Sequence, residues 1–218
     1  MLSTALTTLS LLPLALAHFT LEWPEARGFS DDTSTTFPCG GFNTVSSNRT
    51  NFPTSGGPIQ LDMEHTQTNL AVYLALGDNP GGNFNTILLP QLSQQGLGDF
   101  CMGMVNIPAN LNVSAGTLAT IQVVSNGDGG GGLYQCADVV FVDTPLSTTE
   151  YSDHCKNNTG SKVVQENISG NPNGTAASTT ASATSSVSAA ASAGAAAAQA
   201  TAASWVLGVI GMAGLAML

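Results

Sequence analysis

Residues Pro58–Glu64 read PIQLDME and alternate strictly between apolar and polar side chains. In an extended chain, Ile59, Leu61 and Met63 therefore lie on one face, and the polar residues between them lie on the other. The further predicted strands, separated by Gly, Pro, Asn and Asp, are His18–Trp23, Asn69–Leu76, Phe100–Ile107, Leu118–Ser125 and Leu133–Val142. Short strands at this spacing, with almost no helical periodicity, predict an all-β sandwich in which Arg27–Gly57 forms a long loop.

The N-terminal end of the chain predicts a leader that is removed. Residues 1–17 contain an apolar run that ends in Ala15-Leu16-Ala17, a small-x-small sequence of the kind that signal peptidase cleaves. The run is too short for a membrane span, which takes about 20 residues. A buried strand or helix is the alternative. The preferred interpretation is a signal peptide over residues 1–17 and a mature chain that begins at His18.

The C-terminal end predicts a lipid anchor. Residues 205–218 are apolar and uncharged, and a spacer separates them from a cluster of small residues at Ser192, Ala193 and Gly194. This arrangement is typical of a glycosylphosphatidylinositol (GPI) attachment signal, here residues 192–218 with Gly194 as the attachment residue. A short membrane helix is the alternative. We therefore expect the protein at the extracellular face of the plasma membrane or in the cell wall.

The segment before the anchor signal has a different composition from the rest of the chain. Residues 157–191 are rich in Ser, Thr and Ala and contain almost no large apolar side chains. Such a segment cannot bury enough surface to offset the entropy of ordering, which predicts a disordered, glycosylated stalk. One folded domain, residues 18–156, remains.

The overall composition is acidic and fits secretion. Four Lys and Arg residues stand against fourteen Asp and Glu residues, which gives a formal net charge of -10. Nucleic acid is excluded as a partner, because binding it needs a basic patch. The chain has no CxxC motif, so its cysteines predict two disulfides, with all three pairings open. The cysteines are Cys39, Cys101, Cys136 and Cys155. N-glycosylation sequons begin at Asn48, Asn112, Asn157, Asn167 and Asn173.

Three residues are candidates for a metal site. If cleavage follows Ala17, the α-amino nitrogen and Nδ1 of His18 can chelate one metal ion, and such nitrogen donors favour Cu(II). The alternation of Ile59, Leu61 and Met63 puts His65 on the same apolar face, just past the end of the predicted strand. His65 is therefore either a capped core histidine or a second ligand. Asp138 lies in an otherwise apolar strand, where a buried carboxylate needs a partner. A metal ion, backbone N–H groups and Arg27 are the open alternatives for that partner.

Signatures of enzymes are otherwise weak. The sequence contains no GxSxG, HExxH or P-loop motif. Asp31 and Asp32 are adjacent in a polar loop, and adjacent carboxylates do not flank a substrate as a glycosidase pair does. The sequence therefore favours a binding protein over an enzyme.

Several motifs together resemble one family. The chain resembles the fungal copper-binding proteins of the copper acquisition factor type, which are related to lytic polysaccharide monooxygenases. The resemblance covers essentially the whole chain, including the terminal anchor signal. Its motifs are Ala17-His18-Phe19-Thr20-Leu21, Pro24-x-x-Arg27-Gly28-Phe29, Pro38-Cys39-Gly40-Gly41, His65 and Gln135-Cys136-Ala137-Asp138-Val139.

The resemblance implies an immunoglobulin-like β-sandwich with one copper ion. It implies a histidine brace made by His18, through its amine and Nδ1, and by His65, with Asp138 as an additional ligand. It also implies copper capture or homeostasis at the cell surface, with a membrane copper importer as the expected acceptor, rather than oxidative cleavage of polysaccharide. Two alternatives remain: a copper-dependent monooxygenase that contacts polysaccharide, and a structural cell-wall protein whose histidines are incidental.

Overall fold

The computed structural model describes residues 18–126 and 132–169. The predicted signal peptide, the predicted anchor signal with Gly194, the larger part of the predicted stalk and Asn173 lie outside these ranges. Within them, no helix is long and apolar enough to cross a membrane.

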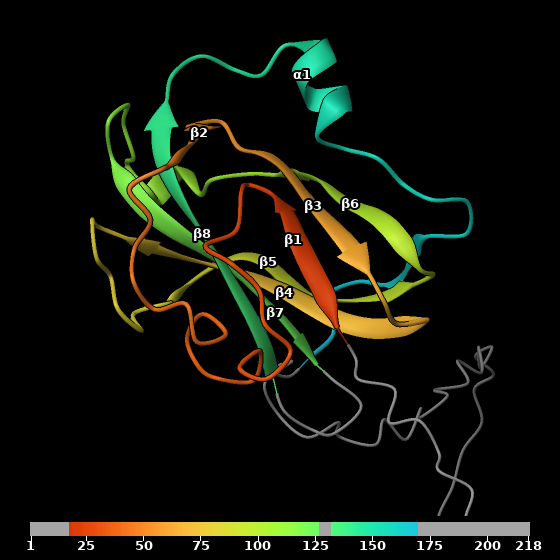
Figure 1. Cartoon of the computed structure of the whole chain (residues 1–218). Coiled ribbons are helices and arrows are strands. Elements are labelled where there is room, and N and C mark those ends of the chain that lie inside the picture. The colour runs from red at the N-terminus through yellow and green to blue at the C-terminus, as the bar shows by residue number, and fades with distance from the viewer. Residues whose placement is uncertain (1–17, 127–131, 170–218) are drawn as a thin grey trace, which may run out of the picture. The chain divides into compact units, whose positions relative to one another are not determined.

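Two β-sheets pack face to face to form the domain (Figure 1). The smaller sheet has the strand order β1-β3-β6, and the larger has the order β2-β8-β7-β4-β5-β9. The strands are β1 Phe19–Trp23, β2 Thr50–Pro53, β3 Gly57–Met63, β4 Gln67–Leu76, β5 Thr86–Gln95, β6 Gly98–Val105, β7 Leu118–Asn126, β8 Gly132–Val142 and β9 Lys162–Gln165. The helices are the short 3-10 helix Ala109–Leu111 and α1, Thr148–Asp153. The predicted all-β, immunoglobulin-like sandwich with long loops is confirmed.

The core lies between the two sheets and follows the alternation seen in the sequence. Ile59, Leu61 and Met63 on β3 are buried, and Ile121 and Phe141 face them from the larger sheet. Burial of apolar area stabilises the fold by about 25 cal/mol per Å². A slip of one residue in the pairing of β3 would turn its apolar side chains outward, so the alternation also fixes the register.

The long loop between β1 and β2 covers the outer face of β7 and β8. Cys136 on β8 points away from the core, because its neighbour Ala137 lies in the core. The loop is attached there by the disulfide between Cys39 and Cys136. From β7, Gln122 Nε2 donates a hydrogen bond to the carbonyl oxygen of Pro38 at 2.7 Å. The loop is therefore held against the sheet at defined points.

The chain after β8 corrects the predicted start of the stalk. A second disulfide joins Cys101 on β6 to Cys155, just after α1, so both pairings are now defined. The N–H of Asn158 donates to the carbonyl oxygen of Asp99 at 2.8 Å. β9 then pairs antiparallel with β5 as an outer strand of the larger sheet. The predicted boundary at residue 157 was wrong, since the residues through β9 belong to the folded domain.

Three carboxylates lie on the three neighbouring strands of the smaller sheet: Glu22 on β1, Asp62 on β3 and Asp99 on β6. Asp62 and Asp99 are paired in register. Partial burial, and then the charges of Asp99 and Asp62, raise the pKa of Glu22 above its usual 4.5, and Lys156 opposes this effect. Glu22 therefore favours folding at low pH, and that contribution is lost as the pH rises through its folded pKa.

Glu22→Gln is expected to raise the free energy of unfolding at pH 7 by roughly 0.2–0.5 kcal/mol, a small value because solvent screens the interaction. At pH 3, where Glu22 is protonated in both states, the two chains should be equally stable. Urea unfolding at the two pH values measures this difference. A variant effect of the same size at both pH values would contradict the proposed repulsion among the three carboxylates.

Candidate metal centre

His18 lies immediately before β1 and is only 7% exposed. Its carbonyl oxygen accepts a hydrogen bond from the N–H of Glu64 at 3.1 Å. The ring of Phe29 packs edge-on against the imidazole, with the ring centroids 5.7 Å apart. The predicted N-terminal residue of the mature chain is therefore packed against the domain.

His65 lies in the turn that joins β3 to β4 and is half-buried. The hydrogen bond from Glu64 to the carbonyl oxygen of His18 places this turn beside the start of β1. The structure thus brings the two predicted histidine ligands to the same end of the sandwich.

Asp31 is a neighbour of His18 that the sequence analysis did not select. Its Oδ1 lies 3.4 Å from Nε2 of His18. The hydroxyl of Ser34 donates to the carbonyl oxygen of Asp31 at 3.0 Å, and the N–H of Tyr134 on β8 donates to the carbonyl oxygen of Ser34 at 2.9 Å. The loop is therefore fixed close to Asp31. In the sequence, only the place of Asp31 in a long polar loop pointed to it, and Asp32 shares that place.

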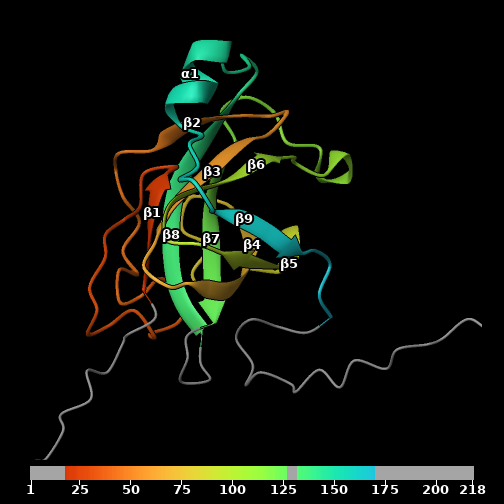
Figure 2. The ribbon, with the colours of Figure 1, turned by 90° about the vertical axis from the view of Figure 1, so that its right-hand side faces the viewer.

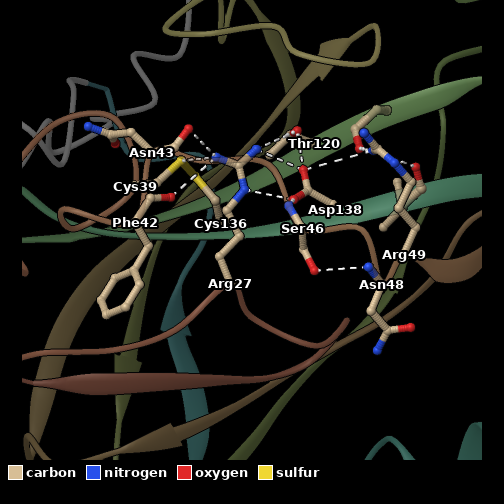
Figure 3. A network of polar contacts seen from close by, with 12 residues as sticks. Arg27, Cys39, Phe42, Asn43, Ser46, Asn48, Arg49, Thr120, Cys136 and Asp138 are labelled. Carbon is tan, nitrogen blue, oxygen red and sulfur yellow. Dashed lines mark hydrogen bonds and ion pairs between the residues drawn. A yellow bond between two sulfur atoms is a disulfide. The ribbon is translucent and has the colours of Figure 1, made fainter.

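Asp138 lies on β8 in a network of polar contacts (Figure 3). Its Oδ2 accepts hydrogen bonds from Nε of Arg27 and from the N–H of Ser46, both at 2.7 Å. Its Oδ1 accepts from Nη2 of Arg27 and from the hydroxyl of Thr120, again both at 2.7 Å. A carboxylate offers about four lone-pair positions, so this carboxylate is saturated. Nη1 of Arg49 adds a second positive charge 3.9 Å from Oδ1.

The protonation of Asp138 follows from these contacts. Burial alone would raise the pKa of the carboxyl. Hydrogen bonds from Arg27, Thr120 and Ser46, with the charge of Arg27, outweigh burial and hold the pKa below its usual 3.8. Of the partners that the sequence left open for Asp138, the structure shows Arg27 and a backbone N–H. The role of Asp138 as a copper ligand stays a prediction, and it would require displacement of at least one of these donors.

The donors around His18 fit a copper ion. The described residues contain no group of three or more His, Cys, Asp or Glu side chains that could hold a metal ion. A brace needs fewer side chains, because one donor is the main-chain nitrogen of His18, which becomes an amine once the bond to Ala17 is cut. Imidazole and amine donors together suit Cu(II). The end of the sandwich that carries His18 and His65 supplies both types, and Asp31 adds a carboxylate beside Nε2 of His18.

The third histidine lies elsewhere. His154 follows α1, and its ring stacks on that of Trp23 with the centroids 5.0 Å apart. Because Trp23 ends β1 and His18 precedes it, the two histidines are separated by the length of that strand. His154 therefore does not belong to the candidate site.

The predicted glycosylation sites all lie on the surface where the structure describes them. Asn48, Asn112, Asn157 and Asn167 are exposed. Nδ2 of Asn48, the atom that would carry a glycan, donates to Glu25 at 3.0 Å. Exposure is what attachment requires, and attachment itself stays a prediction.

Comparison with known proteins supports the resemblance seen in the sequence. A family model described as copper acquisition factor BIM1-like matches residues 16–160. An uncharacterized protein of Aspergillus fumigatus is 44% identical over 161 residues, 72% of this chain and 65% of that protein. Copper acquisition factor BIM1 of Cryptococcus neoformans var. grubii is 36% identical over 151 residues, 65% of this chain and 68% of that protein.

A relative with a different name extends the comparison. The lytic polysaccharide monooxygenase-like protein X325 of Hypocrea jecorina is 37% identical over 160 residues, 63% of this chain and 69% of that protein. The chain thus spans about two thirds of the length of these relatives. The family match covers most of the folded domain and includes all the residues of the candidate site. The chain belongs to the copper acquisition factor BIM1-like family.

Proposed function

We propose that this chain captures one Cu(II) ion, with copper as its cargo. The proposed ligands are the amine and Nδ1 of His18 and the imidazole of His65, and the carboxylate of Asp31 is the partner of Nε2 that orients the ring of His18. The observation that carries the proposal is the contact of 3.4 Å between Asp31 and the buried ring of His18, at the end of the sandwich that also carries His65. The family of the chain associates it with copper.

Each residue has a distinct task in this proposal. His18 supplies two nitrogen donors from one residue, and the edge-on contact of Phe29 limits rotation of its ring. Asp31 supplies a negative charge that offsets part of the charge of Cu(II). Asp138 has an indirect role. Its ion pair with Arg27 attaches the loop that contains Asp31 to strand β8.

The charge of the surface supports a role in collecting cations. The side chains of Arg27 and Arg49, two of the four basic residues, are only 5% and 11% exposed and form ion pairs with Asp138 and Asp78. Lys156 and Lys162 supply the remaining basic charge, so most of the exposed charged groups are carboxylates. A negative potential raises the local concentration of cations and their rate of arrival.

The proposal places the domain outside the plasma membrane, on a GPI anchor, with a membrane copper importer as the acceptor. The predicted leader at residues 1–17 and the predicted anchor signal at residues 192–218 support this location.

A copper-dependent monooxygenase is the second candidate, because several relatives carry names of that kind. Oxidised oligosaccharides formed by the copper-loaded chain with a reductant and chitin or glucan would favour the second candidate.

Asp31→Asn tests the proposed role of Asp31. The dissociation constant of Cu(II) is expected to rise about 10-fold, because the change removes the negative charge beside Nε2 of His18 and keeps the size of the side chain. The electron paramagnetic resonance spectrum of bound Cu(II) should change as well. Both are measured on the secreted chain after sequencing has verified that it begins at His18.

Asp32→Asn is the matched control for this test. It changes the net charge by the same amount in the next residue, so any effect of long-range attraction is shared. We expect it to leave the spectrum unchanged and the affinity close to that of the unaltered chain. Equal behaviour of the two variants would show that Asp31 has no specific role in orienting His18. Copper binding that is unaffected by alanine at both His18 and His65 would favour the structural cell-wall protein instead.

A further inference from the structure

Among the described residues, β1 is an edge strand, and one of its two sides has no neighbouring strand. On its paired side, the carbonyl oxygen of His18 accepts from Glu64 of the β3–β4 turn. Backbone groups of successive residues point to opposite sides of a strand, so those of Phe19 and Leu21 point to the unpaired side. These two residues are buried. Buried N–H and C=O groups need partners, and no strand supplies them here.

One side chain supplies partners for two of these groups. Oε1 of Gln135 accepts a hydrogen bond from the N–H of Leu21 at 2.9 Å, and its Nε2 donates to the carbonyl oxygen of Phe19. Gln135 lies on β8 and is 2% exposed. Its primary amide therefore replaces the missing strand with one donor and one acceptor. Figure 2 shows the two strands that it links, β1 and β8, side by side.

We propose that Gln135 is a positioning residue that holds the N-terminal histidine ready for copper. This inference rests on the proposed function. In a chain that begins at His18, the amine and ring of that residue stand at the free end of a strand, where chains fray. The two bonds from Gln135 fix the main chain of Phe19 and Leu21. The donors of His18 then lose less freedom when they bind, which strengthens binding without any new contact to the metal.

The neighbours of Gln135 hold the other side of the site. The N–H of Tyr134 donates a hydrogen bond to the carbonyl oxygen of Ser34, close to Asp31. Cys136 forms the disulfide with Cys39 of the same loop. Three successive residues of β8 therefore set the positions of both β1, which follows His18, and the loop that carries Asp31. This shared support fixes the position of Asp31 relative to the donors of His18.

Gln135→Met tests the inference, because methionine keeps the length of the side chain and removes both hydrogen bonds. In the secreted chain beginning at His18, the dissociation constant of Cu(II) is expected to rise about 10-fold to 100-fold. The Leu21 amide of the metal-free chain should exchange its hydrogen faster. The paramagnetic resonance of bound Cu(II) should broaden or split as the His18 donors become less ordered. If Gln135→Met does not fold, Gln135→Glu replaces it, since it keeps the acceptor for Leu21 and loses the donor for Phe19.

Gln60→Met is the matched control. Gln60 is also buried, and it also bonds two main-chain groups, the N–H of Lys156 at 2.8 Å and the carbonyl oxygen of Leu61 at 3.2 Å. Its loss should destabilise the domain and leave copper binding unchanged. The inference is overturned if Gln135→Met binds copper as tightly as the unaltered chain, or if Gln60→Met weakens binding to the same extent.

A different result would show that the proposed function is wrong. If the unaltered chain itself shows no one-to-one copper binding, the function and the inference are overturned together. Tight binding that Gln135→Met leaves unchanged overturns the inference alone.

Discussion

Asp138→Ala is expected to lower the free energy of unfolding by about 3–5 kcal/mol. The change removes the acceptor for four hydrogen bonds and leaves the guanidinium of Arg27, which is 5% exposed, without its counter-charge. A buried charge that has lost its partner carries the full cost of its removal from water. The hydroxyl of Thr120 and the N–H of Ser46 lose the same acceptor. Urea unfolding at pH 7 measures the loss.

Asp78→Ala is the control for Asp138→Ala. Asp78 also pairs with an arginine, Arg49, at 2.8 Å, but its side chain is 80% exposed. Arg49 keeps the main-chain carbonyl oxygens of Ala119 and Val139 as acceptors after the change. The expected loss is therefore below about 1 kcal/mol. A loss from Asp138→Ala no larger than that from Asp78→Ala would show that the buried pair contributes little.

The contribution of Asp138 depends on pH. Its pKa is lower in the folded chain than its usual 3.8, so its stabilising effect is complete above that value and is lost as the pH falls through the folded pKa. The difference in stability between the unaltered chain and Asp138→Ala should therefore be constant near neutral pH and shrink below about pH 4.

The variant Asp138→Ala also distinguishes a copper ligand from a residue that only holds the loop in place. A ligand would change the paramagnetic resonance of bound Cu(II) in chains that are still folded, whereas a residue that only fastens the loop would alter it little.

The fold could be predicted because its signals are local. The alternation in β3 and the turn residues between segments depend only on neighbouring side chains, and the structure follows them. β2, Thr50–Pro53, was missed because it lies within Arg27–Gly57, which was predicted to be a loop. β5 was missed because Pro90 and several glutamines interrupt its apolar pattern. β9 was missed because its neighbours are polar, and pairing with β5, rather than its own composition, makes it a strand.

The candidate site could be predicted only in part, for a related reason. His18 and His65 could be proposed because the chemistry of a free N-terminal histidine and the alternation along a strand are readable from the sequence, and their role as ligands stays a prediction. The parity of the strand puts Asp138 on the same face as Cys136, but the expectation that this face points inward was wrong, since Ala137 and Val139 lie in the core. Whether Arg27 or a metal reaches that face depends on contacts between residues 111 positions apart. The position of Asp31 depends on a loop that is attached to β8 by a disulfide between residues 97 positions apart. No local pattern encodes such contacts.

Blocking the amine of His18 is expected to weaken Cu(II) binding by about 100-fold or more, because the amine and the ring of one residue bind as a linked pair. The variant is a chain that begins one residue earlier and carries Ala17→Gln, since an N-terminal glutamine cyclises to pyroglutamate and leaves no free amine. Isothermal titration gives the affinity. The nitrogen couplings in the paramagnetic resonance spectrum report the number of nitrogen donors, which should fall by one.

The matched control is the chain extended by the natural Ala17, which keeps a free amine one residue away from His18. Copper can bind such an end through the amine, the intervening amide and the imidazole, so affinity alone does not distinguish it from the brace. The spectrum does, because the donors and their geometry differ. If the pyroglutamate form binds as tightly as the chain that begins at His18, with the same spectrum, the amine is not a ligand. The copper would then lie elsewhere, and the arrangement of His18, His65 and Asp31 would need another explanation.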